Sequence, residues 1–236
     1  MSESGEGYEA YPGFDRLALD RSGQAEAFDA IGDRYDEAFP QKEGQIAAGR
    51  WLADALPPGS RVLDIGSGTG VPTARQLAEA GHRVVGIDIS AGMVKLARDT
   101  VPDAAFHHAD IADLRAGGRL GPGGPQDLGP FDGAAAFFSL LMLPRPEIPY
   151  ALRTLRGVLR PGGPLALAMV ESDVDDFAVP FLGNTVRVSG YLRDELREVV
   201  REAGFDVVGE DARAYAPAST DVPPEIQLFL HCRRRA

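Results

Sequence analysis

The sequence predicts an α/β fold in which helices cover both faces of a mostly parallel β-sheet. From residue 61 onwards, short apolar runs alternate with stretches in which apolar residues recur at helical spacing. The apolar runs are hydrophobic almost throughout, as in residues 165–170, which is typical of strands buried on both faces. The last two runs, residues 205–210 and 226–232, have no helix between them, so we expect them to pair antiparallel at one edge.

Two helices are expected before the sheet begins. Apolar residues, Tyr35 among them, recur at helical spacing within residues 24–39, and Pro40 interrupts this helix. A second helix fits residues 42–56 and is stopped by the Pro-Pro-Gly sequence that begins at Pro57.

The alternating elements then follow in order, each bounded by turn residues. Ser90 is placed to cap the helix that follows the second strand, and Gly204 closes the last helix. Strands are expected at residues 61–65, 83–87, 105–109, 131–138, 165–170, 205–210 and 226–232, and helices at residues 71–80, 91–100, 149–159 and 191–203.

The length of 236 residues suits one α/β domain with a modest appendage. We expect residues 1–22, which lack periodicity, to be mobile, and residues 23–236 to form the domain. Within it, residues 23–58 would form a helical cap and residues 171–190 an insertion on the substrate side. Residues 115–130 are rich in glycine and proline and are expected to form a flexible excursion.

The composition disfavours several classes of protein. A net charge of −11 and a pI of about 4.8 disfavour a nucleic-acid partner, because duplex nucleic acid repels an acidic surface. No apolar run is long enough to span a membrane, and the first residues lack the apolar core of a secretory signal, so no membrane partner is expected. A single cysteine, Cys232, permits no internal disulfide and suits a cytoplasmic protein.

A glycine loop joins the first strand to the next helix and indicates a bound ligand. Residues 62–70 read Val-Leu-Asp-Ile-Gly-Ser-Gly-Thr-Gly, which places Gly66, Gly68 and Gly70 between strand and helix. Glycines let the main chain turn tightly and let a ligand approach it without Cβ clashes. Ligands of open α/β sheets bind at the carboxyl ends of the strands, so the layout predicts a nucleotide-like ligand.

Three acidic residues narrow the class of this ligand. Asp88 ends the second strand, about 20 residues after the loop, where a carboxylate accepts hydrogen bonds from both ribose hydroxyls. Asp110 ends the third strand and is placed to accept from an adenine amino group. Asp64 precedes the loop, where it can meet the ammonium of an amino-acid tail but would repel a pyrophosphate. The spacing Gly-x-Gly-x-Gly also differs from the Gly-x-Gly-x-x-Gly of dinucleotide-binding folds.

These residues resemble the motifs of the class I S-adenosylmethionine (AdoMet)-dependent methyltransferases, in the type 11/25 small-molecule group. The resemblance runs from about residue 35 to the C-terminus and implies a Rossmann-like, seven-stranded sheet whose last strand is antiparallel. The stretch at 115–130 is longer than the family pattern and departs from it. Five motifs in order carry the resemblance: the loop at 62–70, residues 85–90 followed by Met93, Asp110-Ile111, residues 131–133 with 137–139, and residues 159–163.

The resemblance implies that AdoMet is the methyl donor and S-adenosylhomocysteine the product. It places Asp88 on the ribose, with Ile89 and Met93 beside the adenine. Structural interpretations stay open: the glycines could serve chain turning alone, Asp88 and Asp110 could belong to caps and turns, and Met93 could be core. The residues assigned to the cofactor are Tyr35, Asp64, Gly66, Ser67, Gly68, Thr69, Gly70, Asp88, Ile89, Met93, Asp110, Ile111 and Phe137.

The sequence defines the acceptor site less well. Methyl transfer is an in-line displacement that depends on alignment and on exclusion of water, and a base is needed only where the nucleophile must lose a proton. The weak catalytic candidates are Tyr35, which could cover the methyl site or merely pack, Ser139 at the tip of the fourth strand, and Glu171 at the end of the fifth. Glu171 and the acids at 173–176 could receive an amine, act as a base, or form a solvated charge run.

The tip of the fourth strand indicates the chemistry of the acceptor. Residues 137–142 read Phe-Phe-Ser-Leu-Leu-Met, which favours an aromatic or lipophilic acceptor unless these side chains belong to the core. Catechol-type methyltransferases of similar fold carry an acid at this tip, so we expect no metal here.

The leading hypothesis is therefore methyl transfer to a small molecule through an O, N or C nucleophile. Three alternatives stay open: a protein that binds AdoMet without methylating, a protein or RNA methyltransferase, and an NAD-dependent dehydrogenase. The protein is expected to be a monomer or a homodimer. Its use of Ala, Gly, Arg and Pro is typical of a high-GC bacterium, and a role in specialised metabolism is an association drawn from that usage alone.

Overall fold

The computed structural model describes residues 22–114, 120, 128–218 and 223–236. The segment expected to be mobile, residues 1–22, lies outside the described residues except for Ser22, and so does most of the stretch 115–130. Within the described ranges, no helix is both long enough and apolar enough to cross a membrane.

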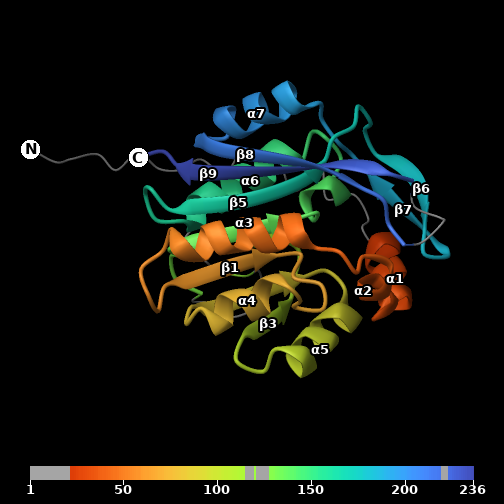
Figure 1. The fold of residues 1–236 in the computed structure, drawn as a ribbon, viewed down its shortest axis with the longest axis horizontal. Coiled ribbons are helices and arrows are strands. Elements are labelled where there is room, and N and C mark those ends of the chain that lie inside the picture. The colour runs from red at the N-terminus through yellow and green to blue at the C-terminus, as the bar shows by residue number, and fades with distance from the viewer. Residues whose placement is uncertain (1–21, 115–119, 121–127, 219–222) are drawn as a thin grey trace, which may run out of the picture.

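The predicted α/β fold is confirmed (Figure 1). Five parallel strands are followed in the sheet by an antiparallel pair, in the order β3-β2-β1-β4-β5-β9-β8. The last strand of the chain, β9, is antiparallel as expected, and it lies between β5 and β8. The strands are β1 (Arg61–Ile65), β2 (Arg83–Asp88), β3 (Ala105–His108), β4 (Gly133–Phe137), β5 (Pro164–Val170), β8 (Phe205–Tyr215) and β9 (Glu225–Arg234).

Helices pack on both faces of this sheet. Strand β5 is buried along nearly its whole length, which explains why its sequence is apolar throughout. Each large apolar side chain buried in this way contributes about 1.5–3 kcal/mol. One face is covered by α3 (Glu43–Asp54), α4 (Thr73–Glu79) and α5 (Ala91–Thr100), and the other by α6 (Ile148–Val158) and α7 (Arg193–Glu202).

Local chemistry sets the boundaries of the helices. The helix expected at 71–80 begins only at Thr73, with Pro72 in the N-cap position before it. Ser90 caps α5 as predicted, since its Oγ accepts a hydrogen bond from the Met93 backbone N–H at 3.0 Å.

The single helix predicted over residues 24–39 is wrong. The structure has two helices, α1 (Ser22–Ile31) and α2 (Arg34–Ala38), with a bend at Gly32 between them. Gly32 has a φ of +54°, a left-handed conformation that glycine adopts without the penalty of a Cβ.

The region predicted as a helical cap divides into two parts. Helix α3 lies on the sheet beside α4, whereas α1 and α2 lie together at one end of the sheet, on the right in Figure 1. Asp29 anchors α1 there, because its Oδ1 accepts hydrogen bonds from Ser90 Oγ at 2.5 Å and from the Gly92 backbone N–H at 2.8 Å. These contacts bring α1 against the N-terminus of α5.

The predicted insertion at 171–190 contains a β-hairpin that the sequence analysis missed. Its strands are β6 (Phe177–Phe181) and β7 (Asn184–Val188), joined by a two-residue turn. Leu182 and Gly183 in this turn have φ of +49° and +79°, which is the twist that two-residue hairpin turns require. The hairpin lies beside α1 and α2 (Figure 1).

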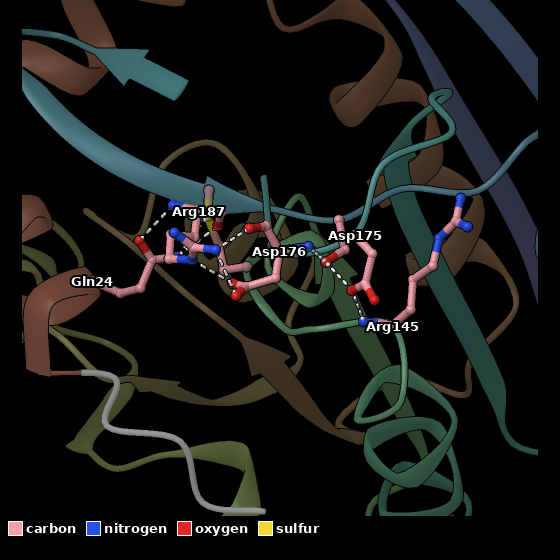
Figure 2. Close-up of polar contacts among 7 residues, drawn as sticks. Gln24, Arg145, Asp175, Asp176 and Arg187 are labelled. Carbon is pink, nitrogen blue, oxygen red and sulfur yellow. Dashed lines mark hydrogen bonds and ion pairs between the residues drawn. The ribbon is translucent and has the colours of Figure 1, made fainter. Parts of the chain in front are cut away.

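Gln24 of α1 holds the hairpin from one side (Figure 2). Its Nε2 donates to the Arg187 carbonyl at 2.8 Å, and its Oε1 accepts from the Arg187 backbone N–H at 2.9 Å, so the amide continues the ladder of β7. The Arg187 guanidinium donates in turn to both carboxylate oxygens of Asp176, at 2.6 and 2.7 Å. These bonds hold the pKa of Asp176 below its usual range.

Arg145 holds the chain that enters the hairpin from the other side (Figure 2). Its backbone N–H donates to Asp175 Oδ1 at 2.8 Å, and its guanidinium donates to Asp173 at 2.7 Å and to the Gly190 carbonyl at 2.7 Å. Ser189 Oγ also donates to Asp175, at 3.3 Å. The acids of the 173–176 run are therefore engaged in structural pairs.

The last two strands are longer than predicted. Their ladder continues beyond the expected ends to Tyr215 opposite Glu225, so an antiparallel ribbon extends past the parallel strands. Charged residues flank this part of the ribbon, and Arg213 pairs with Asp211 at 2.7 Å. Because the sequence of this extension is polar, a search for apolar runs did not predict it as part of the strands.

We predict that Gln24→Ala lowers the free energy of unfolding by about 1–3 kcal/mol, because the two partly buried hydrogen bonds to the backbone of Arg187 are lost together with the buried Gln24 side chain. Glu26→Ala, at an exposed position of the same helix, is the matched control. Urea denaturation of both variants measures the effect. Equal midpoints for the two variants would show that Gln24 does not hold the hairpin.

Candidate active site

A cavity, called here the loop cavity, lies at the carboxyl ends of β1, β2 and β4. The structure brings together in its lining most of the residues that the sequence assigned to a ligand. These are Tyr35, Gly66, Ser67, Gly68, Thr69, Asp88, Ile89, Met93, Asp110, Ile111, Phe137 and the catalytic candidate Ser139.

Two of the loop glycines have different roles. Gly66 has a φ of +66°, and a Cβ there would lie only 2.3 Å from the Cβ of Ser139, so this position needs glycine to pack on the tip of β4. Gly68 has a φ of +52°, and a Cβ there would meet no atom within 4 Å. Gly68 therefore presents bare main chain to open space, where a ligand can approach it.

Asp88 fixes the shape of the loop. Its Oδ2 accepts from the Gly68 backbone N–H at 2.9 Å, and its Oδ1 accepts from the Ser90 backbone N–H at 2.9 Å. Burial raises the pKa of Asp88, and these two hydrogen bonds oppose the rise. Each oxygen keeps acceptor capacity beyond its bond to the main chain, so the carboxylate can also accept from a ligand in the loop cavity.

Asp64 and Gly70, both predicted to contact the cofactor, are absent from the lining of the loop cavity. Asp64 is buried, and its Oδ2 has no hydrogen-bond partner among the described residues. Burial, with a contribution from the charge of Asp88, raises the pKa of Asp64 to about 7. A Cβ on Gly70 would lie 3.0 Å from Val101 and 3.3 Å from Phe106, so this glycine serves close packing.

In the part of the loop cavity that the sequence analysis assigned to adenine, some residues also have structural roles. Asp110 lines the cavity and caps the short turn η2 (Ile111–Asp113), because its Oδ1 accepts from the Ala112 backbone N–H at 2.8 Å. Met93 belongs to a buried cluster with α1 and the hairpin, and it also lines the cavity. Asp110 and Met93 therefore have the structural roles that the sequence left open, and both still line the cavity in which a ligand would bind.

Helix α2 connects the loop to the cap. Thr69 Oγ1 donates to Asp36 Oδ2 at 2.7 Å, and Lys42 forms an ion pair with the other oxygen of Asp36. Lys42 also donates to the Val71 carbonyl at 3.2 Å. Phe138 and Met142, at the tip that the sequence analysis linked to the acceptor, also line the loop cavity. The sequence analysis missed Phe28, Lys42 and Gln45 of the same lining. No local pattern marks them, since tertiary packing alone brings them to the loop.

A larger cavity of about 640 Å³, called here the aromatic cavity, adjoins the loop cavity. It lies between α2, the hairpin and the extended ends of β8 and β9. Nearly parallel rings line it: Phe39 stacks on Tyr35, Phe181 and Tyr215 at centroid distances of 5.0, 5.8 and 5.8 Å. The two cavities share the lining residues Tyr35, Lys42, Gln45, Phe138 and Met142.

Phe138 stands at the boundary of the two cavities with a strained backbone. Its φ is +54°, which is uncommon for a bulky residue and found most often at functional sites. The ring packs edge-on against Phe229 at 5.7 Å. This tip of β4 thus serves both the core and the cavities.

The weak catalytic candidates differ in their surroundings. Glu171 lines the aromatic cavity, but its carboxylate accepts from the Arg193 guanidinium at 3.0 Å and is not a free base. Ser139 Oγ has no hydrogen-bond partner among the described residues, and so no base activates it. Burial is the main cause that raises the pKa of Tyr35, so its hydroxyl stays protonated at neutral pH.

The described ranges contain no group of three or more His, Cys, Asp or Glu side chains that could hold a metal ion. His108 Nε2 lies 2.9 Å from the Ile89 carbonyl, a partner that the sequence could not show.

Comparison with known proteins shows which families and proteins this chain resembles. Residues 62–163 match the model of the methyltransferase domain family. The chain is 34% identical over 229 residues to the biotin biosynthesis bifunctional protein BioHC of Cellvibrio japonicus, which covers 90% of this chain and 41% of that protein. It is 30% identical over 184 residues to methyltransferase GfsG of Streptomyces halstedii, covering 73% and 63%. The chain thus spans less than two thirds of the length of these relatives.

A solved structure supports the same fold. The 1,6-didemethyltoxoflavin-N1-methyltransferase of Burkholderia thailandensis was crystallised with 1,6-didemethyltoxoflavin and S-adenosylhomocysteine. It superposes with a TM-score of 0.66 at 22% identity, over 91% of this chain and 88% of that one.

We predict a pH dependence of stability from Asp64. Unfolded Asp64 ionises near pH 3.8, whereas folded Asp64 keeps its proton to about pH 7. Between these values the unfolded state binds fewer protons, so stability falls as the pH rises. The free energy of unfolding of the wild-type chain should therefore decrease relative to Asp64→Asn through this window and then level off. Denaturant titrations across the window measure it, and a constant difference would contradict the prediction.

Proposed function

We propose that this chain, as a member of the class I AdoMet-dependent methyltransferase family, transfers a methyl group from AdoMet to a small-molecule acceptor. One observation carries the proposal: the loop cavity, which suits an adenosyl ligand, opens beside a separate aromatic cavity and shares part of its wall with it. Two adjoining cavities are what a transfer between two bound molecules requires.

The residues of the loop cavity fit AdoMet. Gly68 leaves space for a ligand against the main chain, and Asp88, held by two backbone N–H groups, is oriented to accept from ribose hydroxyls. Ile89, Met93 and Ile111 supply apolar contacts for adenine.

Buried polar atoms beside the loop favour the amino-acid tail of AdoMet. Asp64 Oδ2, Ser67 Oγ and Ser139 Oγ are buried without partners among the described residues, and such atoms cost free energy until they are bonded. An ammonium group would pair with Asp64 and favour its ionised form. Asp64 does not line the cavity, so we propose that it acts from behind the loop.

Alignment and exclusion of water then account for catalysis. AdoMet, when bound, supplies an electrophilic methyl group on a sulfonium centre. Tyr35 and Phe138, which line both cavities, would hold the acceptor against the methyl site and keep water out. We propose that α1, α2 and the hairpin within residues 171–190 form the acceptor side of one domain.

Methylation distinguishes this proposal from its closest alternative, a protein that binds AdoMet without transferring the methyl group. Purified protein would be incubated with methyl-labelled AdoMet and a small-metabolite extract, with heat-inactivated protein as the control. We expect label in a small molecule together with release of S-adenosylhomocysteine. Binding of AdoMet without either product would favour the non-methylating alternative.

A macromolecular acceptor is less favoured, because the net charge of −11 repels nucleic acid and the aromatic cavity is a hollow of about 640 Å³ with apolar walls. Label incorporated into RNA or protein and into no small molecule would reverse this order.

We predict that Asp88→Ala weakens AdoMet binding by about 1–3 kcal/mol, because the ribose loses its acceptor and the loop loses the bond to Gly68. Asp103→Ala, which removes an exposed carboxylate after α5, is the matched control. Isothermal titration calorimetry measures both. Unchanged affinity in Asp88→Ala would place the cofactor elsewhere.

A further inference from the structure

We propose that the acceptor is an aromatic molecule that carries a basic amine, and that the amine pairs with Glu225 in the aromatic cavity. The inference rests on the proposed function, because it concerns the acceptor side of the same site. It is drawn from the balance of charges in the wall and from the position of Glu225 on the extended ribbon.

The wall of the aromatic cavity favours a flat ring system. Phe39 and Tyr215 lie at an interplanar angle of 13°, and Phe39 and Phe181 at 26°, so three rings present similar orientations. A planar acceptor gains contact area with such rings and can stack in the offset manner that aromatic pairs prefer. The same rings also favour a cation, through the negative potential of their faces.

Among the charged side chains that line the aromatic cavity, one carboxylate has no ion-pair partner within the described residues. Lys42 is paired with Asp36, and Glu171 is paired with Arg193. Glu225 forms no ion pair within the described residues, and its Oε1 accepts only from the Gln227 side chain, at 2.8 Å. The wall therefore holds one carboxylate that lacks a cationic partner among the described residues, which disfavours carboxylate and phosphate acceptors and favours ammonium groups.

Glu225 is close to the rings that would hold the acceptor. It begins β9 opposite Tyr215, and its charge adds to the effect of burial in raising the pKa of Tyr35. Tyr35 lies at the junction with the loop cavity. An ammonium on Glu225 would thus anchor one end of the acceptor while its ring lies along the aromatic wall toward the methyl site. The sequence analysis named amine binding as one of three roles open to Glu171 and the acids at 173–176, but Glu171 already has Arg193 as its partner.

Three matched probes test the inference: naphthylethylamine, naphthylethanol and naphthylacetate, which share a ring system and differ in charge. Calorimetric titration into the full-length protein, saturated with S-adenosylhomocysteine, gives the three affinities. We expect the amine to bind at least about tenfold more tightly than the alcohol, as a charge-assisted hydrogen bond permits. Naphthylacetate should bind most weakly.

Two variants then locate the interaction. Glu225→Gln should bring the amine to the affinity of the alcohol, and Glu171→Gln should leave their ratio unchanged. The inference is overturned if the wild-type protein binds the amine no better than the alcohol, or if Glu171→Gln abolishes the preference while Glu225→Gln keeps it. Failure of S-adenosylhomocysteine to bind would instead overturn the proposed function.

Discussion

The carboxylate of Asp88 accepts hydrogen bonds from two backbone N–H groups, and the arrangement of the site depends on them. The bond from Gly68 holds the loop after β1 in the position that exposes bare main chain, and the bond from Ser90 sets the start of α5. One side chain at the end of β2 therefore orients both the loop and the adjacent helix. Its remaining acceptor capacity faces the loop cavity, so the same group that shapes the site can recognise a ligand.

The second constraint is that segments far apart in the sequence together enclose the aromatic cavity. Asp36 links α2 to the loop through Thr69, and Gln24 links α1 to the hairpin through Arg187. The ribbon of β8 and β9 completes the aromatic cavity with Tyr215. Side-chain hydrogen bonds therefore position the cap and hairpin parts of this wall, and the sheet supplies the rest.

The sequence predicted the sheet and the loop cavity because both are encoded locally. Apolar runs mark the parallel strands, and the glycines with Asp88 predict a ligand site at their carboxyl ends, where the structure has the loop cavity. The hairpin was missed because its strands are short and Pro180 interrupts the first of them, although Leu182-Gly183 gives a turn signal. Lys42 and Glu225 could not be assigned from local pattern, since each reaches a cavity only through tertiary packing. Glu171 was a reasonable candidate whose partner, Arg193, becomes evident only in the fold.

Binding selectivity tests the assignment of the loop cavity most directly. Calorimetric titrations of the same protein preparation with S-adenosylhomocysteine and with NAD would compare an adenosyl amino acid with a dinucleotide. The arrangement of Asp64 and Asp88 around the loop predicts saturable binding of S-adenosylhomocysteine at one site per chain and no heat of binding with NAD. Saturable binding of NAD, or no binding of S-adenosylhomocysteine, would contradict the assignment.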